Sequence, residues 1–252
     1  MTEHVRITEE AGGVRLVRLD RPEKKNALTG AMYDAMREAL EEADRDGSGI
    51  GAVVFAGLPG AFTAGNDIAD FVARAGRDAG DGPALRFIRR LAATRTPLVA
   101  AVDGLAVGIG TTMILHCDLV YVAPSARFRM PFVDLGLVPE AASTYLLPRR
   151  VGIPKATELM LLAEAFDGDE AVRLGLANAV VPGDTLVEHA LSQAARLAAK
   201  PRGALAASRA LIRGDAAAVE AAMAAESRAF EAALCSPEAQ AAFRAFLDRA
   251  KG

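Results

Sequence analysis

The chain has 252 residues, of which 52% are hydrophobic and 24% charged, and its formal net charge is −3 at pH 7. This length and hydrophobic content are sufficient for a large buried core. The weak negative charge argues against a nucleic-acid partner, which requires a basic surface. The N-terminal segment MTEHVRITEE lacks the features of a secretion signal or transit peptide, and Cys117 and Cys235 lack metal-ligand spacing. We therefore expect a soluble, cytoplasmic protein without a metal site.

The first part of the chain alternates between predicted strands and predicted helices. Strands are expected at 14–19 and 51–56, and the second is an unbroken apolar run of the kind that is buried on both faces. A helix is expected at 29–44, with Thr29 as its N-cap, and another at 83–94. This alternation predicts an α/β fold.

The most informative stretch is the apolar run at 98–122, which has the length of a membrane span. Its repeated glycines and an Asp-Gly pair argue against a span, because glycine weakens a helix and Asp-Gly marks a turn. We expect two buried strands instead, at 98–102 and 118–122, with a glycine-lined turn and a buried helix that begins near Gly108. Glycine ahead of a helix leaves backbone N–H groups accessible to a ligand, and the helix dipole favours negative charge there. The run therefore predicts an anion-stabilising site and no membrane span.

The remainder of the chain is predicted to be mostly helical. Residues from 154 onward are rich in alanine, with one short predicted strand at 176–182. Continuous helices replace the alternation near 182–184, so we divide the chain into a core at 1–184 and a C-terminal helical region at 185–252. The narrow alanine stripes of this region suit close packing against a neighbouring body.

Four segments of the chain occur in the order and at the spacings typical of the crotonase (enoyl-CoA hydratase/isomerase) superfamily. They are DRPEKKNAL at 20–28, AFTAGNDIADF at 61–71, the glycine-containing block at 102–128 and LGLVPEAASTYLLPRRVG at 135–152. The chain resembles this family over roughly residues 5–250. The resemblance implies a spiral of ββα turns followed by a C-terminal helical trimerisation region. It also implies an acyl-CoA thioester substrate, no separate cofactor, and a homo-trimer or hexamer.

The resemblance assigns two backbone N–H groups to an oxyanion hole that stabilises a thioester enolate. These are the N–H of Asn66, after the turn glycine Gly65, and the N–H of Ile109, after Gly108. The family often has glycine where this chain has Ile109, but a backbone donor does not require glycine. Each preorganised donor in a dry site lowers the barrier by about 3–4 kcal/mol. The alternative is that these glycines serve only close packing of strands against helices.

The resemblance places the two glutamates with which hydratases of the family handle water at Thr112 and Phe132. Neither residue transfers a proton at neutral pH. Glu140 remains, and the subset of the family that resembles Δ3,Δ2-enoyl-CoA isomerases carries a glutamate there, together with a Pro-Phe pair like Pro131-Phe132. We therefore predict an enoyl-CoA isomerase, in which Glu140 takes a proton from C2 and returns it to C4. Apolar neighbours are expected to raise the pKa of this carboxyl.

Other interpretations remain open at this stage. Glu140 is also explained as a favourable charge at a helix N-terminus, because Pro-Glu commonly begins a helix. The spacing of Asp134 suggests a turn. A second functional hypothesis is a hydratase or another acyl-CoA lyase or hydrolase of the superfamily, including one in which a carboxylate at position 140 acts as nucleophile. A third is a non-catalytic CoA-binding subunit.

The resemblance assigns the coenzyme A slot to the backbone at 24–27 and 64–68. The candidate CoA-binding and substrate-binding residues are Lys24, Asn26, Ala27, Ala64, Gly65, Asp67, Ile68, Gly108 and Phe132. Arg21, Lys24 and Lys25 are candidate phosphate contacts, with a solvated turn as the alternative. Asp67 is expected to cap a helix around 68–72, and His116 to be a core histidine.

Overall fold

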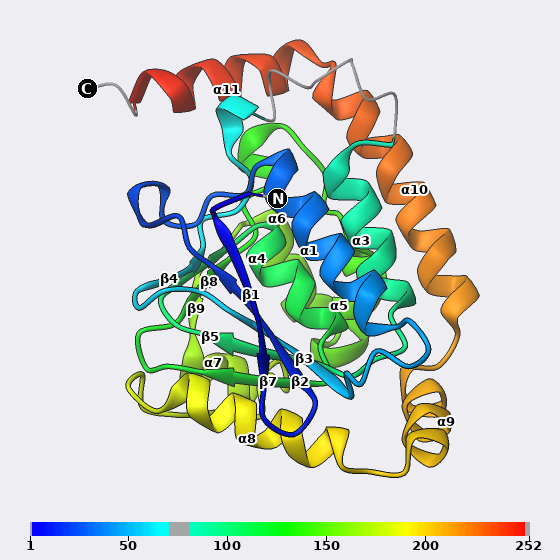
Figure 1. Cartoon of the computed structure of the whole chain (residues 1–252). Coiled ribbons are helices and arrows are strands. Elements are labelled where there is room, and N and C mark those ends of the chain that lie inside the picture. The colour runs from blue at the N-terminus through cyan, green and yellow to red at the C-terminus, as the bar shows by residue number, and fades with distance from the viewer. Residues whose placement is uncertain (1, 71–80, 250–252) are drawn as a thin grey trace.

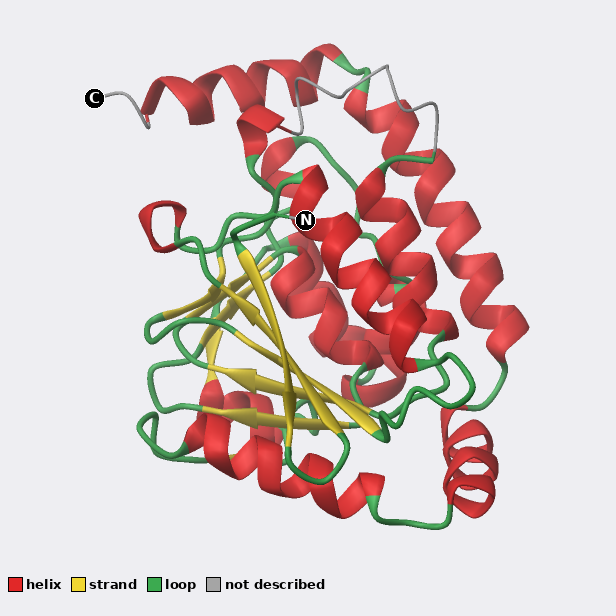
Figure 2. Ribbon diagram, viewed as in Figure 1, coloured by secondary structure: helices red, strands yellow, loops and turns green. Residues whose placement is uncertain are grey.

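The computed structural model describes residues 2–70 and 81–249, which form two sheets surrounded by helices (Figures 1 and 2). The larger sheet contains, in spatial order, β1 (Val5–Glu10), β2 (Val14–Leu19), β3 (Ala52–Ala56), β5 (Leu98–Val102), β7 (Leu119–Val122) and β10 (Ala179–Val180). The smaller sheet contains β4 (Ala61–Thr63), β6 (Leu105–Val107), β8 (Arg127–Arg129) and β9 (Phe166–Asp167). Neighbouring strands are parallel except in the β1–β2 and β8–β9 pairs.

Consecutive strands alternate between the two sheets. β3 is followed by β4, β5 by β6, and β7 by β8, so each turn of the chain places one strand in each sheet. Parallel neighbours require a crossover, and helices supply it. The crossovers include α3 (Pro83–Ala93) after β4 and α4 (Ile109–Thr112) after β6. This arrangement confirms the predicted α/β spiral of ββα turns.

The other helices complete the fold around the sheets. They are η1 (Pro22–Lys24), α1 (Gly30–Ala43), η2 (Met113–His116), η3 (Val133–Leu135), α5 (Ser143–Val151), α6 (Ile153–Leu161), α7 (Gly168–Arg173), α8 (Leu186–Ala198), α9 (Arg202–Arg213), α10 (Ala216–Leu234) and α11 (Pro237–Arg249). In Figure 1, α1, α3 and α5 lie on one side of the larger sheet and α8 lies on the other.

Most of the elements predicted in the first part of the chain are present. Thr29 is the N-cap of α1, and its side chain accepts a hydrogen bond from the N–H of Met32. Every residue of β3 is buried, as its unbroken apolar sequence predicts. The central run contains one strand that was not predicted, β6, because its three residues pair with the smaller sheet rather than forming a simple turn. The helix after Gly108 is also short and continues as the 3-10 helix η2.

The C-terminal region packs partly on the rest of the same chain. α8 covers the larger sheet through Leu186, Ala190 and Ala194, which belong to the same buried cluster as its strands. α10 buries Met223 against the main core. The division at residue 184 therefore stays a prediction, and α8 packs with the sheet of the first part. No helix in the described ranges is long and apolar enough to cross a membrane.

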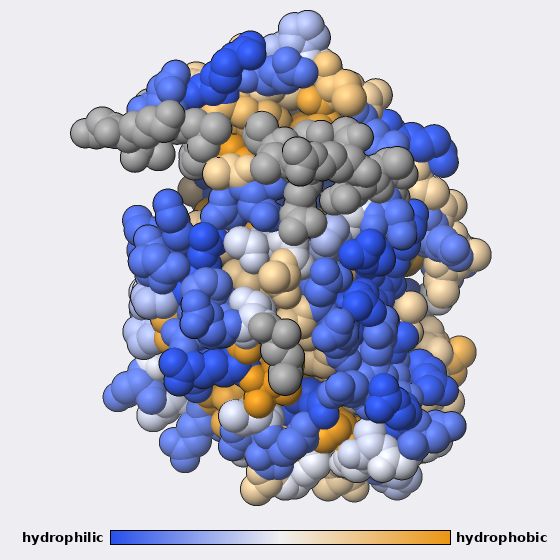
Figure 3. Space-filling view, turned by 45° about the horizontal axis from the view of Figure 1, so that its top comes forward, coloured by the Kyte–Doolittle hydropathy of each residue, from blue (hydrophilic) through white to orange (hydrophobic). Residues whose placement is uncertain are grey.

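α9 differs from its neighbours because none of its residues is buried. Its Leu211 and Ile212 are 83% and 85% exposed. On the face drawn in Figure 3, hydrophilic residues predominate and hydrophobic residues show in smaller groups. Two adjacent aliphatic side chains with this much exposed surface favour a contact between α9 and another molecule.

The connection from β5 to β6 predicts a large effect for one substitution. Gly104 has φ +68, and a Cβ there would lie 1.9 Å from the carbonyl oxygen of Gly60. Gly175 has nearly the same φ, +71, with nothing within 4 Å of its Cβ position. We expect Gly175→Ala to lower the free energy of unfolding by about 1–2 kcal/mol through backbone strain alone. Gly104→Ala should lower it by several kcal/mol more, because backbone must also move. Urea unfolding measures both, and equal losses would contradict this interpretation.

Candidate active site

Two glycine-containing segments meet where β4 and β6 end. The strands are parallel neighbours, so their carboxyl ends lie at the same edge of the smaller sheet. Gly65 has φ +91, and a Cβ there would lie 2.9 Å from the carbonyl oxygen of Val107, so the two segments touch. No described residue accepts a hydrogen bond from the N–H of Asn66 or of Ile109. Two free backbone donors on adjacent segments can stabilise negative charge on a ligand.

The glycines near these donors serve different purposes. Gly110 is packed tightly, since a Cβ there would lie 2.6 Å from Thr63 Cγ2. Gly108 has space, with Phe132 Cζ as the nearest atom at 3.9 Å, but its φ of 56° and ψ of −116° suit only glycine. The conformation of Gly108, rather than its packing, therefore directs the Ile109 N–H. The explanation by packing alone fails for this glycine.

Glu140 lies between η3 and α5 with a buried carboxyl oxygen. Its Oε1 atom is buried and has no hydrogen-bond partner in the described part of the chain, although the residue as a whole keeps some exposed surface. Burial, together with the negative charge of Glu226, raises the pKa of Glu140 from 4.5 to about 8. A carboxyl of this kind accepts and returns a proton near neutral pH.

The interpretation of Glu140 as a helix-terminal charge is not what the structure shows. α5 begins at Ser143, and the N–H groups of Ala142 and Thr144 donate to the carboxylate of Glu226 on α10 instead. Glu226 was not identified from the sequence as a residue of the site. Its spacing from Met223 and Phe230 places it on the apolar stripe of α10, which is a signal that the sequence does carry.

Tyr33 on α1 links the oxyanion segment to Glu140 and was also missed. Its hydroxyl donates a hydrogen bond to Asn66 Oδ1. Burial raises the pKa of Tyr33 well above 10, and the negative charges of Glu140 and Asp70 add to this effect. Tyr33 is therefore bound to Asn66 and is also within the electrostatic influence of Glu140, because a buried site screens charges less than water does. A tyrosine on the apolar face of a helix gives no functional signal in one sequence.

The positions of the hydratase glutamates are filled by buried residues. Thr112 is completely buried and its Oγ1 atom has no hydrogen-bond partner among the described residues, while Phe132 is 5% exposed. Asp134 is exposed and forms a 2.8 Å ion pair with Arg129 in the turn η3. The turn predicted at Asp134 is confirmed, and Glu140 differs from Asp134 in having a buried carboxyl oxygen.

The two segments assigned to coenzyme A lie side by side. The N–H of Ala64 donates to the Lys25 carbonyl at 3.0 Å, and the N–H of Leu28 donates to the Gly65 carbonyl at 2.8 Å. Lys24 and Lys25 are exposed at η1. Ala27 and Ile68 lie beside them on these same two segments and are partly exposed. The structure thus brings the predicted slot together, while its contact with a ligand stays a prediction.

Two polar residues of this region bind within the protein. The Asn26 side chain is buried; it accepts from the Arg21 N–H at 2.7 Å and donates to the Ala61 carbonyl at 2.8 Å. Arg21 donates to the Ala27 carbonyl and to Asp67 Oδ2, both at 2.8 Å. Arg21 is therefore held by internal partners, and Lys24 and Lys25 are the better candidates for phosphate contacts.

Asp67 has the capping role that the sequence predicts. Its Oδ1 accepts from the N–H groups of Ala69 and Asp70 at 3.0 and 3.2 Å, at the start of the helix that begins at Ile68. Burial alone would raise the pKa of Asp67. The hydrogen bonds from Arg21 and from these N–H groups lower it by more, so the net effect is a lowered pKa. Residues 71 and 72 of the predicted helix lie outside the described residues.

His116 is a core histidine, as predicted. It is buried, and its Nε2 lies 2.7 Å from the carbonyl oxygen of Ala141. A carbonyl only accepts, so Nε2 carries the proton. Burial lowers the pKa of His116 to about 4, so the ring is neutral at physiological pH and supports the loop that follows Glu140.

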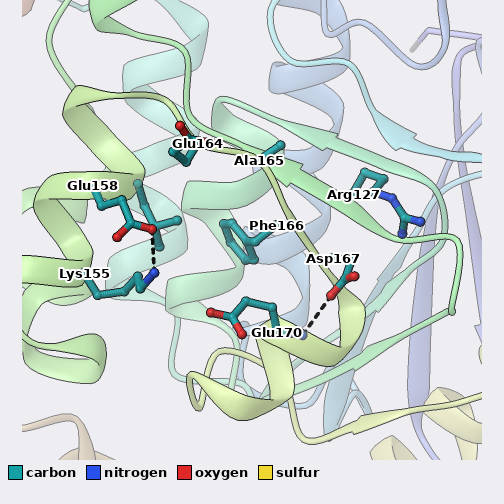
Figure 4. Close-up of a pocket in the computed structure, with 9 residues that line it drawn as sticks. Arg127, Lys155, Glu158, Glu164, Ala165, Phe166, Asp167 and Glu170 are labelled. Carbon is teal, nitrogen blue, oxygen red and sulfur yellow. Dashed lines mark hydrogen bonds and ion pairs between the residues drawn. The ribbon is translucent and has the colours of Figure 1, made fainter.

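A separate surface hollow lies beside β9, α6 and α7 (Figure 4). Two contacts lie within it: Lys155 Nζ is 2.5 Å from Glu158, and the Asp167 carboxylate accepts from the backbone N–H of Glu170 at 2.9 Å. None of the predicted site residues lines this hollow. The hollow therefore carries no part of the candidate active site.

Comparison with known proteins identifies the family. The model of a family described as enoyl-CoA hydratase/isomerase matches residues 9–252. The chain belongs to the enoyl-CoA hydratase/isomerase family. It is an acyl-CoA enzyme of the crotonase superfamily. An acyl-CoA thioester has a carbonyl oxygen, which is the kind of group that preorganised N–H donors stabilise.

Individual relatives carry different names within this family. The chain is similar to a solved enoyl-CoA hydratase/isomerase from Pseudoalteromonas atlantica, with 38% identity, a TM-score of 0.91 and 98% of each chain covered. It is 36% identical to a probable enoyl-CoA hydratase, echA8, of Mycobacterium leprae, over 76% of this chain and 74% of the relative. It is 34% identical to enoyl-CoA delta isomerase 2 of Rattus norvegicus, over 82% of this chain and 54% of the relative.

The raised pKa of Glu140 predicts a pH-dependent stability. Between pH 4.5, its usual pKa, and about pH 8, the folded enzyme holds a proton here that the unfolded chain has released. The free energy of unfolding therefore falls as pH rises through this window. Glutamine does not titrate, so the Glu140→Gln variant should not lose free energy of unfolding in this window. The free energy of unfolding of the variant should therefore exceed that of the parent by an amount that grows with pH and levels off above pH 8. Urea unfolding from pH 4.5 to 9 measures this, with Asp134→Asn as an exposed control. Equal stability of parent and Glu140→Gln at pH 9 would contradict the burial of the charge.

Proposed function

We propose that the enzyme moves the double bond of a 3-enoyl-CoA to the 2-position. The observation that carries this proposal is the Glu140 carboxyl, whose buried Oε1 has no hydrogen-bond partner among the described residues, together with the N–H groups of Asn66 and Ile109, for which no described residue is an acceptor. An isomerase requires one group to move one proton, whereas water addition needs a means of holding and activating water. Thr112 and Phe132 supply no carboxylate for that purpose.

The proposed reaction has two steps. First, the C2–H bond breaks, the proton moves to a Glu140 carboxylate oxygen, and the electron pair moves onto the thioester oxygen of a dienolate. The N–H groups of Asn66 and Ile109 stabilise this oxygen, at about 3–4 kcal/mol for each donor. Second, the electron pair returns from the oxygen and the C2=C3 double bond forms, while the C3=C4 double bond breaks and its electron pair takes the proton from Glu140 at C4.

The substrate would enter with its coenzyme A moiety in the slot formed by 24–27 and 64–68. Lys24 and Lys25 are exposed at the edge of this slot and would meet the phosphates. Gly108 and Phe132 would face the thioester end. Coenzyme A is part of the substrate, and we propose no separate cofactor.

A second candidate function is hydration of a 2-enoyl-CoA, which the name of the Mycobacterium leprae relative favours. The two reactions differ in their products, because isomerisation conserves the formula and hydration adds water. Assays of one preparation with 3-hexenoyl-CoA and with crotonyl-CoA separate them. Hydration as fast as isomerisation would favour the second candidate.

Replacement of the proposed base tests the mechanism. Glu140→Gln keeps the side-chain volume and removes proton transfer, so turnover of 3-hexenoyl-CoA should fall at least about a hundredfold. Binding of coenzyme A, measured by calorimetry, should stay unchanged. Asp134→Asn replaces an exposed carboxylate and should keep the parental rate. A Glu140→Gln enzyme with most of its activity would show that another group moves the proton.

We also propose that the enzyme assembles as a homo-trimer, or as a hexamer that consists of two trimers. The exposed Leu211 and Ile212 on α9 are an apolar surface that an interface would bury. Multi-angle light scattering should give three or six times the 26.3 kDa mass of the chain. A stable, active monomer in this measurement would contradict the proposed assembly and leave the role of Glu140 untouched.

A further inference from the structure

The loop that carries Glu140 is held in an unfavourable backbone conformation. Ala141 and Ala142, which follow it directly, have φ values of 62° and 53°. Left-handed conformations of non-glycine residues cost roughly 1–2 kcal/mol each and persist only where their surroundings hold them. One constraint is the hydrogen bond between His116 Nε2 and the Ala141 carbonyl. The other comes from α10.

Glu226 on α10 makes three hydrogen bonds to this loop. It accepts from the Ala142 N–H at 2.6 Å, from the Thr144 N–H at 2.9 Å and from the Thr144 hydroxyl at 2.5 Å. Ala142 is the N-cap of α5 and has no side-chain acceptor of its own, so Glu226 provides the cap from another helix. It is 6% exposed, which makes it a buried anchor between the C-terminal region and the loop.

The two carboxyl groups have opposite surroundings. Burial raises the pKa of Glu226, and hydrogen bonds from three donors oppose this effect by favouring its charged form, with a raised pKa as the net result. Glu140 Oε1 receives no hydrogen bond from any residue that the structure describes. Two nearby carboxyl groups in such different environments divide their roles, so that one keeps the charge and the other holds the proton.

The remaining titratable groups around the loop do not provide a compensating charge. Tyr33 faces Glu140 from α1, and His116 from η2 is neutral. Arg150 of α5 and Arg213 of α9 donate to the carbonyls of Leu115 and His116. Within residues 2–70 and 81–249, no lysine or arginine forms an ion pair with Glu140 or Glu226.

We propose that Glu226 is a positioning residue for Glu140: it fixes the loop that carries Glu140 and holds a negative charge beside it. The part of this inference that is tested by turnover rests on the proposed function. The charge disfavours the ionised form of Glu140, which makes its carboxylate a stronger base. Helix α10 of the C-terminal region is thereby part of the support for the site and not only a covering element.

The first experiment compares Glu226→Gln, which removes the charge, with Glu226→Asp, which keeps the charge but shortens its reach. Glu220→Gln is the matched control, because Glu220 is exposed on the same helix. With 3-hexenoyl-CoA, Glu226→Gln should lower kcat by about tenfold or more, with a smaller change in KM. The acidic limb of its kcat/KM profile should move to lower pH. Glu226→Asp and Glu220→Gln should keep the limb of the parent.

The second experiment measures the same effect without turnover. Glu140→Gln is combined with Glu226→Gln, and the free energy of unfolding is measured from pH 4.5 to 9. The stabilisation that Glu140→Gln produces at high pH should be smaller when Glu226 is already glutamine, because the charge that opposes ionisation is gone.

The two experiments separate the inference from the proposed function. An unshifted acidic limb in Glu226→Gln, or the same shift in Glu226→Asp, would overturn the electrostatic role of Glu226. If the parent enzyme does not isomerise enoyl-CoA, the proposed function fails, and the unfolding measurement still decides the inference. An undiminished effect of Glu140→Gln in that measurement would overturn it.

Discussion

The proposed chemistry of this site depends on the burial of the Glu140 Oε1 atom, which has no hydrogen-bond partner in the part of the chain that the structure describes. An exposed carboxyl is ionised at neutral pH but is a weak base, since its pKa lies near 4.5. Burial and the nearby charge of Glu226 raise that pKa to about 8, which makes the ionised form a much stronger base. The same burial destabilises the folded chain when the group ionises, so this site exchanges stability for reactivity.

The surrounding fold holds several groups in conformations that they would not adopt alone. Gly108 turns the chain so that the Ile109 N–H remains free, and Gly65 lets the Asn66 segment approach it. Ala141 and Ala142 are left-handed, and Glu226 and His116 bind this loop from two different helices. Strain and unpaired donors gather where the enzyme would stabilise an anion and move a proton, as is common in active sites. The parallel strands β4 and β6 explain why these segments meet.

The alternation of strands and helices predicted an α/β fold, and the resemblance of four motifs to the family implied the spiral, both candidate donors and Glu140. The local signal at this site was the glycine ahead of the helix at Gly108, which predicted an anion-stabilising site. β9, whose two residues pair with β8, has no periodicity to detect. The roles of Tyr33 and Glu226 depend on contacts across the fold, with residues 33 and 84 positions away, and only folded coordinates reveal them.

Isotope transfer tests most directly whether one shielded carboxyl moves the proton. 3-Hexenoyl-CoA that carries two deuterium atoms at C2 is converted in ordinary water, and the 2-hexenoyl-CoA product is analysed by mass spectrometry and NMR. A carboxyl that receives a deuteron in a buried site returns it to C4 before exchange with solvent is complete. We therefore expect deuterium at C4 of the product in the parent enzyme. Product with only solvent hydrogen at C4 would contradict proton transfer by Glu140 alone.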